Sequence, residues 1–173
     1  MKKLLTALLI SGSMMAFADT GGYIGIGAGA GWNDVNTAGA AFRLDGGYKF
    51  TDMLAVELGT TKLAQSGSGA LNQNLQFTDL SLKYTWKFHE LLSLVGQAGG
   101  AFVDPGTIAS PSSASVILNN RVNQSGWDFM AGLGLAYKLT EAASVTVTDY
   151  YYAGGVNYQG NTNLLLAGIN YSF

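Results

Sequence analysis

The stretch that decides the fold is YIGIGAGAGW, residues 23–32, in which glycine occupies every second position from Gly25 to Gly31. It contains the loose dinucleotide-binding pattern GxGxxG/A at 25–30, which needs a strand before it and a helix after it. It also has the period of two that is typical of a β-strand with one apolar face and one bare face. Because the glycines lie within the alternating pattern itself, the strand is the better interpretation. Its bare face would leave room for longer side chains from elsewhere.

The same alternation recurs along most of the chain. It predicts eight strands of about nine to eleven residues, the length that a tilted strand needs to cross a bilayer. The predicted strands lie around residues 23–32, 40–50, 54–59, 79–88, 92–102, 127–138, 144–152 and 165–173.

A short repeat predicts how these strands are connected. Residues 48–54, 86–92 and 137–143 each carry an aromatic residue, a lysine and an apolar residue, followed by three residues centred on an acid. Keeping the apolar faces of both flanking strands in phase requires three-residue hairpin turns there. The other connections are longer and polar, at 33–39, 62–74, 103–125 and 153–163. This asymmetry is typical of outer-membrane barrels, in which the turns are periplasmic and the loops extracellular.

The first 18 residues differ from the rest of the chain. Lys2 and Lys3 precede the apolar run Leu4–Ile10, and Ala16-Phe17-Ala18 provides small residues at a cleavage site. This layout predicts a cleavable signal peptide over residues 1–18 and export through the Sec pathway, because the apolar run is too short to span a bilayer. We expect the barrel domain to occupy residues 19–173.

Composition narrows the class of protein further. Without Lys2 and Lys3, seven basic side chains face eleven acidic ones, a formal charge of −4 that argues against nucleic acid as a partner. Only 12% of residues are charged, against roughly 25% in soluble domains. Aromatic residues make up 12% of the chain, and 24 of its 173 residues are glycine. There is no cysteine, and therefore no disulfide framework. An exported chain of this composition fits a membrane β-barrel.

Alternation alone leaves open which face is outside. A soluble lipocalin-like binding protein would turn the apolar face inward, whereas a membrane barrel turns it to lipid. The aromatic residues of the apolar face favour lipid, because they sort into two belts around an aliphatic band. The loop-end belt is Trp32, Phe42, Phe102, Trp127 and Phe129, and the turn-end belt is Tyr48, Phe50, Trp86, Phe88, Tyr137, Tyr171 and Phe173.

Together these features resemble the OmpA/OmpX-like group of outer-membrane proteins, over residues 19–173. The most specific part is the alternating final strand, 164–173, in which Ile169, Tyr171 and the terminal Phe173 are in phase. This ending is similar to the signal read by the barrel-assembly machinery of such proteins. The resemblance implies an all-β fold, an eight-stranded antiparallel up-and-down transmembrane barrel in a Gram-negative outer membrane, in contact with lipid and lipopolysaccharide. Full-length OmpA proteins continue into a peptidoglycan-binding domain, whereas this sequence stops at the barrel, so cell-wall anchoring is not implied.

The opposite face of the strands carries charges that must pair in a narrow interior. They are Arg43, Asp45, Lys49, Glu57, Asp79, Lys83, Lys87, Asp128 and Lys138. In OmpA-like barrels an ionic network plugs the lumen, and its rearrangement is held to permit small conductance. By this analogy we expect a lumen network here, either as static salt bridges or as a gate. Its expected members are Arg43, Asp45, Glu57, Asp79, Lys83 and Asp128.

Asp149 breaks the alternation, because it shares its parity with Val145 and Val147 and would point to lipid. We expect a β-bulge to return it to the interior. The alternative is that it stays outward at a height near the lipid headgroups, which would lower the cost.

Enzymatic function is not expected. Outer-membrane hydrolases use histidine-assisted hydrolysis, but the one histidine here, His89, lies in a predicted turn beside Glu90, and no cysteine is present. We therefore expect no catalytic residue, metal or cofactor. The favoured role is structural and surface-displaying, with the loop at 103–125 as the site for an extracellular partner. The alternatives are a small ion or solute channel and a soluble lipocalin-like binding protein.

Overall fold

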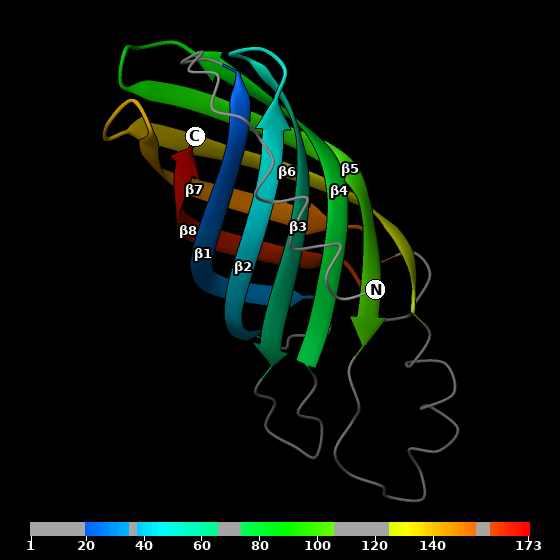
Figure 1. Ribbon diagram of the computed structural model, residues 1–173. Helices are drawn as coiled ribbons and strands as arrows, with labels where there is room; N and C mark the ends of the chain where they lie inside the picture. Colours follow the sequence, from blue (N-terminus) through cyan, green and yellow to red (C-terminus); the bar gives the residue numbers. More distant parts are fainter. Residues whose placement is uncertain (1–19, 35–37, 66–73, 106–124, 155–159) are drawn as a thin grey trace, which may run out of the picture.

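The computed structural model describes residues 20–34, 38–65, 74–105, 125–154 and 160–173. Their strands form a closed antiparallel barrel in which each strand pairs with its neighbours in the chain and β1 pairs with β8 (Figure 1). The strands are β1 (Gly21–Asn33), β2 (Ala38–Lys49), β3 (Leu54–Gln65), β4 (Asn74–Lys87), β5 (Leu92–Pro105), β6 (Gly126–Lys138), β7 (Ala143–Tyr152) and β8 (Thr162–Ser172). The eight-stranded up-and-down barrel predicted from the sequence is confirmed.

In the described residues, no helix is both long and apolar enough to cross a membrane.

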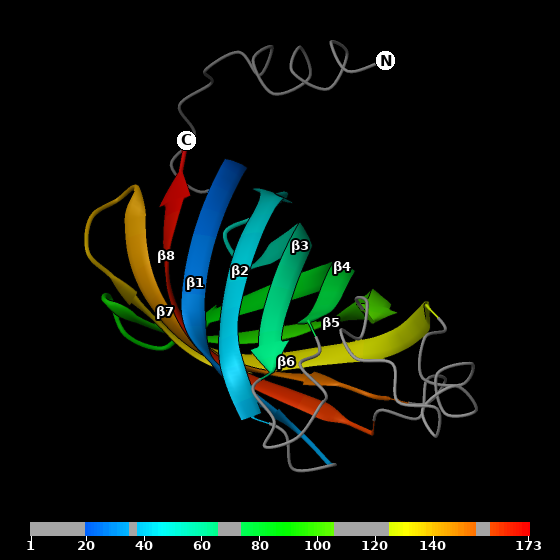
Figure 2. The same ribbon diagram turned by 90° about the horizontal axis from the view of Figure 1, so that it is seen from below.

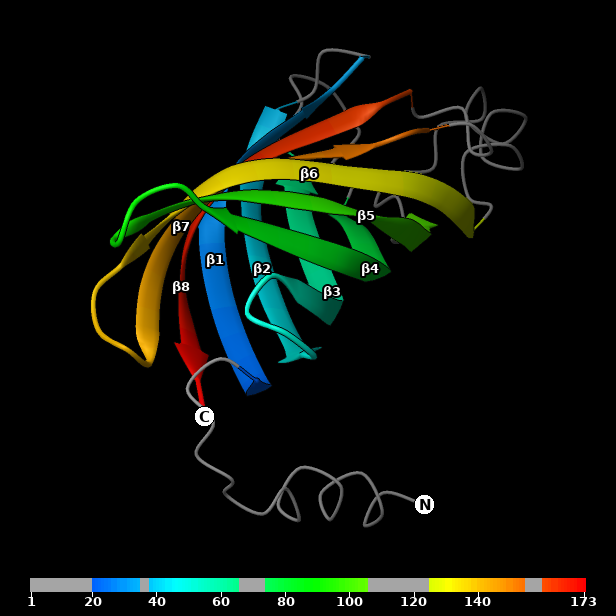
Figure 3. The same ribbon diagram turned by 90° about the horizontal axis from the view of Figure 1, so that it is seen from above.

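The strands are strongly tilted. Following directly paired residues once around the barrel from Gly22 returns to β1 at Trp32, ten residues further along the strand. Such a stagger requires tilted strands, and strands on opposite sides of the barrel cross at a wide angle (Figures 2 and 3). We call the end with the short turns the turn end and the opposite end the loop end.

The three short turns have the predicted length. Phe50 N–H donates to the Leu54 carbonyl at 2.9 Å, and Leu139 N–H donates to the Ala143 carbonyl at 2.9 Å, so each pair brackets three residues. In the third turn, Lys87 pairs with Ser93, so that Phe88 and Leu92 face each other across the three residues 89–91. Within this turn, His89 and Leu92 exchange two backbone hydrogen bonds, at 3.2 and 3.3 Å.

The first residue of each turn also accepts hydrogen bonds. The Oγ1 atoms of Thr51 and Thr140 each accept two backbone N–H groups, and His89 Nδ1 accepts the Leu91 N–H at 3.3 Å. Side-chain acceptors of this kind stabilise tight turns. They explain why the repeat places Thr, His and Thr before its acids.

The apolar face points outward, as predicted. Leu82 and Leu133 are 57% and 61% exposed, whereas Arg43 and Glu57 are 4% and 0% exposed inside the barrel. The soluble lipocalin-like alternative requires the opposite arrangement and is therefore wrong.

The glycines of the opening stretch line the interior. A Cβ at Gly25 would collide with the side chains of Asp45 and Asn170, and one at Gly31 would collide with Leu164. Gly59 on β3 likewise leaves the space that the Arg43 guanidinium fills. These glycines belong to a strand, and their bare faces make room for side chains from other strands.

The loop-end boundaries of several strands and part of the interior differ from the prediction. The loop expected at 103–125 begins later, because β5 continues to Pro105. The loop expected at 62–74 is shorter, because β3 continues to Gln65 and β4 begins at Asn74. The additional residues turn Leu63, Leu75 and Phe77 inward. They belong to an apolar cluster in the loop-end half of the lumen, which we call the apolar plug. Its members are Ala41, Leu63, Leu75, Phe77, Ala101, Val103, Met130, Tyr150, Tyr152, Leu164 and Leu166.

The expected bulge at Asp149 is also wrong. β7 pairs with β6 and β8 in unbroken register, with Asp149 directly opposite Leu133 and Leu165. The strand therefore keeps its alternation, and the exposed Asp149 side chain lies on the outward face.

Candidate functional site: the ionic cluster of the lumen

Arg43 is the centre of a buried cluster formed by inward positions of β2, β3 and β4. Its Nη1 and Nη2 donate to the two carboxylate oxygens of Asp79 at 2.7 and 2.8 Å, and Nη2 also donates to Glu57 at 3.0 Å. Asp45, two residues along β2, lies 3.5 Å from Arg43 Nε. The two-pronged Arg43–Asp79 contact is the geometry in which arginine binds carboxylates most strongly.

Glu57 is the main acceptor of the cluster. Its carboxylate accepts hydrogen bonds from Lys83 Nζ at 2.7 Å, from the Tyr23 hydroxyl at 2.7 Å and from Gln97 Nε2 at 2.8 Å, in addition to Arg43. A buried carboxylate with this many donors is compensated for its loss of water. Glu57 therefore connects β1, β2, β4 and β5 across the lumen.

Five of the six residues predicted for the network converge: Arg43, Asp45, Glu57, Asp79 and Lys83. The sixth, Asp128, is buried nearer the loop end. There it lines a cavity of about 10 Å³ with Phe77, Tyr152 and Thr162.

Several neutral partners were missed by sequence reasoning. Thr61 accepts a hydrogen bond from Arg43 Nη1 at 3.0 Å, and Gln97 Nε2 also donates to Ser81 at 2.6 Å. The Lys83 ammonium and the Arg43 guanidinium lie 4.8 and 4.6 Å from the ring centres of Tyr23 and Tyr150. The alternation of inward and outward positions along each strand could have found them, because all of them occupy inward positions.

A series of cavities approaches the cluster from the turn end. The first, of about 150 Å³, is lined by Lys49, Lys87 and Lys138. The next, of about 70 Å³, extends from Lys49 to Lys83, and the last, of about 20 Å³, reaches Arg43 and Asp45. Beyond the cluster lies the apolar plug. Among the described residues, the cavities thus become smaller from the turn end towards the cluster, and apolar side chains pack together in the loop-end half of the lumen.

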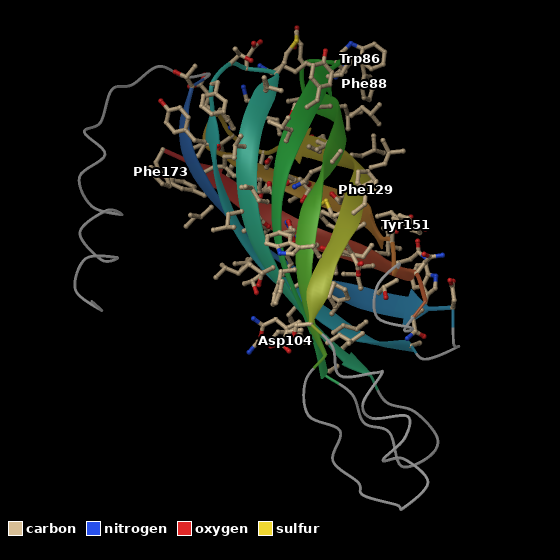
Figure 4. All side chains as sticks on the ribbon, turned by 90° about the vertical axis from the view of Figure 1, so that its right-hand side faces the viewer. Trp86, Phe88, Asp104, Phe129, Tyr151 and Phe173 are labelled. Atoms are coloured by element: carbon tan, nitrogen blue, oxygen red, sulfur yellow. The ribbon has the colours of Figure 1, made fainter. Side chains whose placement is uncertain are left out.

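The predicted belt residues all lie on the outward surface. Trp86 and Phe88 project from the turn end, and Phe129 lies towards the loop end (Figure 4). Neighbouring rings contact each other, with centroid distances of 5.5 Å for Tyr48–Phe50 and 5.7 Å for Phe102–Trp127. The exposed belt side chains are Trp32, Tyr48, Phe50, Trp86, Phe88, Phe102, Trp127, Phe129 and Tyr137. Their position at the two bilayer interfaces stays a prediction.

The final strand keeps its alternation to the end. Ile169, Tyr171 and Phe173 all point outward and are more than half exposed. Their role as an assembly signal is not tested by this geometry.

Potential metal ligands do not gather in the described part of the chain, where no group of three or more His, Asp or Glu side chains could hold a metal ion.

Comparison with known proteins identifies the barrel. A model of the outer membrane protein beta-barrel domain matches residues 4–173. The chain belongs to this family. It is an integral outer-membrane barrel of the Gram-negative type, and its outward apolar face contacts lipid. No curated protein matches the sequence.

Solved structures of outer-membrane barrels share the fold of this family member. Neisserial surface protein A is 16% identical, with a TM-score of 0.69 over 88% of this chain and 96% of that one. The N-terminal barrel of Pseudomonas aeruginosa OprF is 18% identical, with a TM-score of 0.61 over 89% and 99%. OprG from the same organism is 16% identical, with a TM-score of 0.59 over 89% and 97%.

Proposed function

We propose that this outer-membrane barrel is a structural protein of the envelope that displays its loops at the cell surface and whose lumen is closed to solutes. The apolar plug is the observation that supports closure. Leu63, Met130 and Leu164 are completely buried within it, and the rings of Phe77 and Tyr152 pack with centroids 4.4 Å apart. Close-packed apolar side chains leave no hydrated path for an ion.

Planar-bilayer recording of the refolded protein tests this proposal. The wild-type barrel is expected to show no steady openings. The double variant Phe77→Ala, Met130→Ala removes two large side chains from the plug and is expected to leak, which gives the positive control. Steady openings of the wild-type protein would contradict a closed lumen.

A small channel is the second candidate, and the cavities that lead from the turn end to the ionic cluster favour it. In this case the wild-type barrel would conduct, and Glu57→Ala or Lys83→Ala would abolish its steady openings. Conductance that is absent in the wild type and in both variants would exclude this candidate.

Surface display rests on the orientation of the barrel. The family places short turns in the periplasm and loops outside, and the longest predicted loop, 103–125, starts at the loop end of β5. Its residues 106–124 lie outside the described residues. An epitope inserted at 112–113 is expected to be labelled by antibody on intact cells, whereas one inserted at Glu90 in the β4–β5 turn is labelled only after lysis. The reverse pattern would contradict display of this loop.

A further inference from the structure

Asp149 does not belong to the ionic cluster of the lumen, because its side chain lies on the outward, lipid-facing side of β7. Val145 and Val147 separate it from the turn end of β7, and Tyr151 is the next outward residue towards the loop end. Its direct neighbours across β6 and β8 are the exposed residues Leu133 and Leu165. Asp149 therefore lies within the apolar band, where a charged or polar side chain is costly and marks a functional position.

The carboxylate lacks a partner in its own chain. Within the described residues, neither a hydrogen bond nor an ion pair reaches Asp149. Lipid chains provide no donor at this depth. Lys62, an outward cation, lies near the loop end of β3, on the opposite side of the barrel from β7. The carboxylate therefore stays open to a donor from another molecule within the membrane.

Tyr151 supplies the matching donor on the same face. It is 38% exposed, points outward (Figure 4), and carries a phenolic hydroxyl two residues from Asp149. Two residues along a tilted strand correspond to a height difference of about 5 Å, which the length of a tyrosine side chain can bridge. The patch thus holds an acceptor and a donor that can pair with a copy of itself.

Symmetry fixes how such a pair would meet. Two copies inserted in the same direction can make a self-complementary contact only about a two-fold axis along the membrane normal, so that equal heights face each other. Beside Asp149 the surface carries the small residues Ala131 and Ala167 on β6 and β8. Small residues let membrane-spanning elements approach closely.

We propose that the outward face of β6, β7 and β8 is a dimer interface for a second copy of this chain, in which the Tyr151 hydroxyl of each copy donates to the Asp149 carboxylate of the other. Apolar neighbours such as Leu133 and Leu165 supply the surrounding contact. The proposal is independent of whether the lumen conducts.

Cysteine cross-linking in intact outer membranes tests the interface, since the chain has no cysteine of its own. Single cysteines at Val147 and Leu165 report on the proposed face. Leu58→Cys is the matched control, because Leu58 is an exposed apolar residue on β3, four strands away. We expect at least tenfold more cross-linked dimer from the proposed face than from Leu58→Cys. Equal yields, or cross-links only to a different protein, would overturn the proposal.

Two substitutions in the Leu165→Cys background test the hydrogen bonds. Tyr151→Phe removes only the hydroxyl and is expected to lower the dimer yield at least fivefold, and Asp149→Leu is expected to abolish it. Gel mobility of unboiled samples confirms that each variant still forms a barrel. An unchanged dimer yield with Tyr151→Phe in folded barrels would overturn the pairing.

Discussion

Arg43 occupies the space next to Gly59, and this single contact makes the glycine hard to replace. A Cβ at Gly59 would collide with the guanidinium, which is itself held by Asp79 and Glu57. Gly96 is the opposite case, because it lies on the outward face and a Cβ there meets no atom within 4 Å in the described structure. The two glycines have the same chemistry and different surroundings.

Gly59→Ala is therefore expected to lower the free energy of unfolding by about 1–3 kcal/mol, since overpacking displaces the Arg43 side chain. Gly96→Ala is expected to leave stability unchanged or to raise it by up to about 1 kcal/mol, because alanine restricts the unfolded chain. Urea unfolding from liposomes, followed by tryptophan fluorescence, measures both. A similar loss in both variants would contradict this account of the interior.

The carboxylates of the cluster differ in how many donors they satisfy. Glu57 accepts hydrogen bonds from four side chains, whereas Asp45 Oδ2 is buried without a hydrogen-bond partner in the described structure. Glu57→Gln and Asp45→Asn remove the same formal charge. The first is expected to cost about 3 kcal/mol, because it weakens several buried contacts to charged groups. The second is expected to cost less than about 1 kcal/mol.

The same unfolding assay compares these two variants. Equal losses would indicate that the cluster responds to total charge and not to individual hydrogen bonds.

At this scale, sequence parity predicted which charges face inward but not which of them meet. Asp128 faces the lumen, as Asp79 does, yet it lies closer to the loop end. The difference in height comes from the stagger of ten residues around the barrel. Tyr23 was also missed. It lies on the inward face of β1 with the glycines, but only charged residues were considered as members of the network.

At the scale of strands and turns, alternation was sufficient to predict every strand and the length of the turns. It failed at the loop-end limits of β3, β4 and β5, because the inward side chains there are apolar. Leu63, Leu75 and Phe77 belong to the apolar plug. An alternation of apolar and polar residues, which was the signal used to predict strands, is therefore weak in these segments. The bulge predicted at Asp149 was wrong for the opposite reason. One charged residue on the outward face did not interrupt the regular pairing of β7.

The final strand carries a prediction about assembly. Deletion of Phe173 is expected to reduce the amount of folded barrel in the outer membrane of cells several-fold, because the terminal aromatic would no longer mark the strand for assembly. Refolding of the same variant into liposomes is expected to be nearly unchanged. Phe50→Ala is the control, since Phe50 is an exposed aromatic of the same end outside the final strand. Equal defects in cells and in liposomes would show a folding role and not an assembly signal.

At the scale of the whole molecule, two environments divide the barrel. The outward face carries exposed apolar side chains on all eight strands, with Asp149 as a charged residue among them, while the lumen combines an ionic cluster with an apolar plug. Sequence reasoning predicted the first environment from composition and alternation. It did not predict the plug, because an interior too narrow for solvent can be filled by apolar or paired polar side chains alike.

The most direct test of this account is the accessibility of spin labels placed one at a time at residues 79–84 of β4 in lipid bilayers. Labels at Leu80, Leu82 and Tyr84 are predicted to collide more with oxygen, which dissolves in lipid, than with a water-soluble nickel complex. Labels at the alternate, inward positions are predicted to be shielded from oxygen. A nickel complex that reaches Leu80 and Leu82 as readily as bulk solvent would contradict a lipid-facing outer surface.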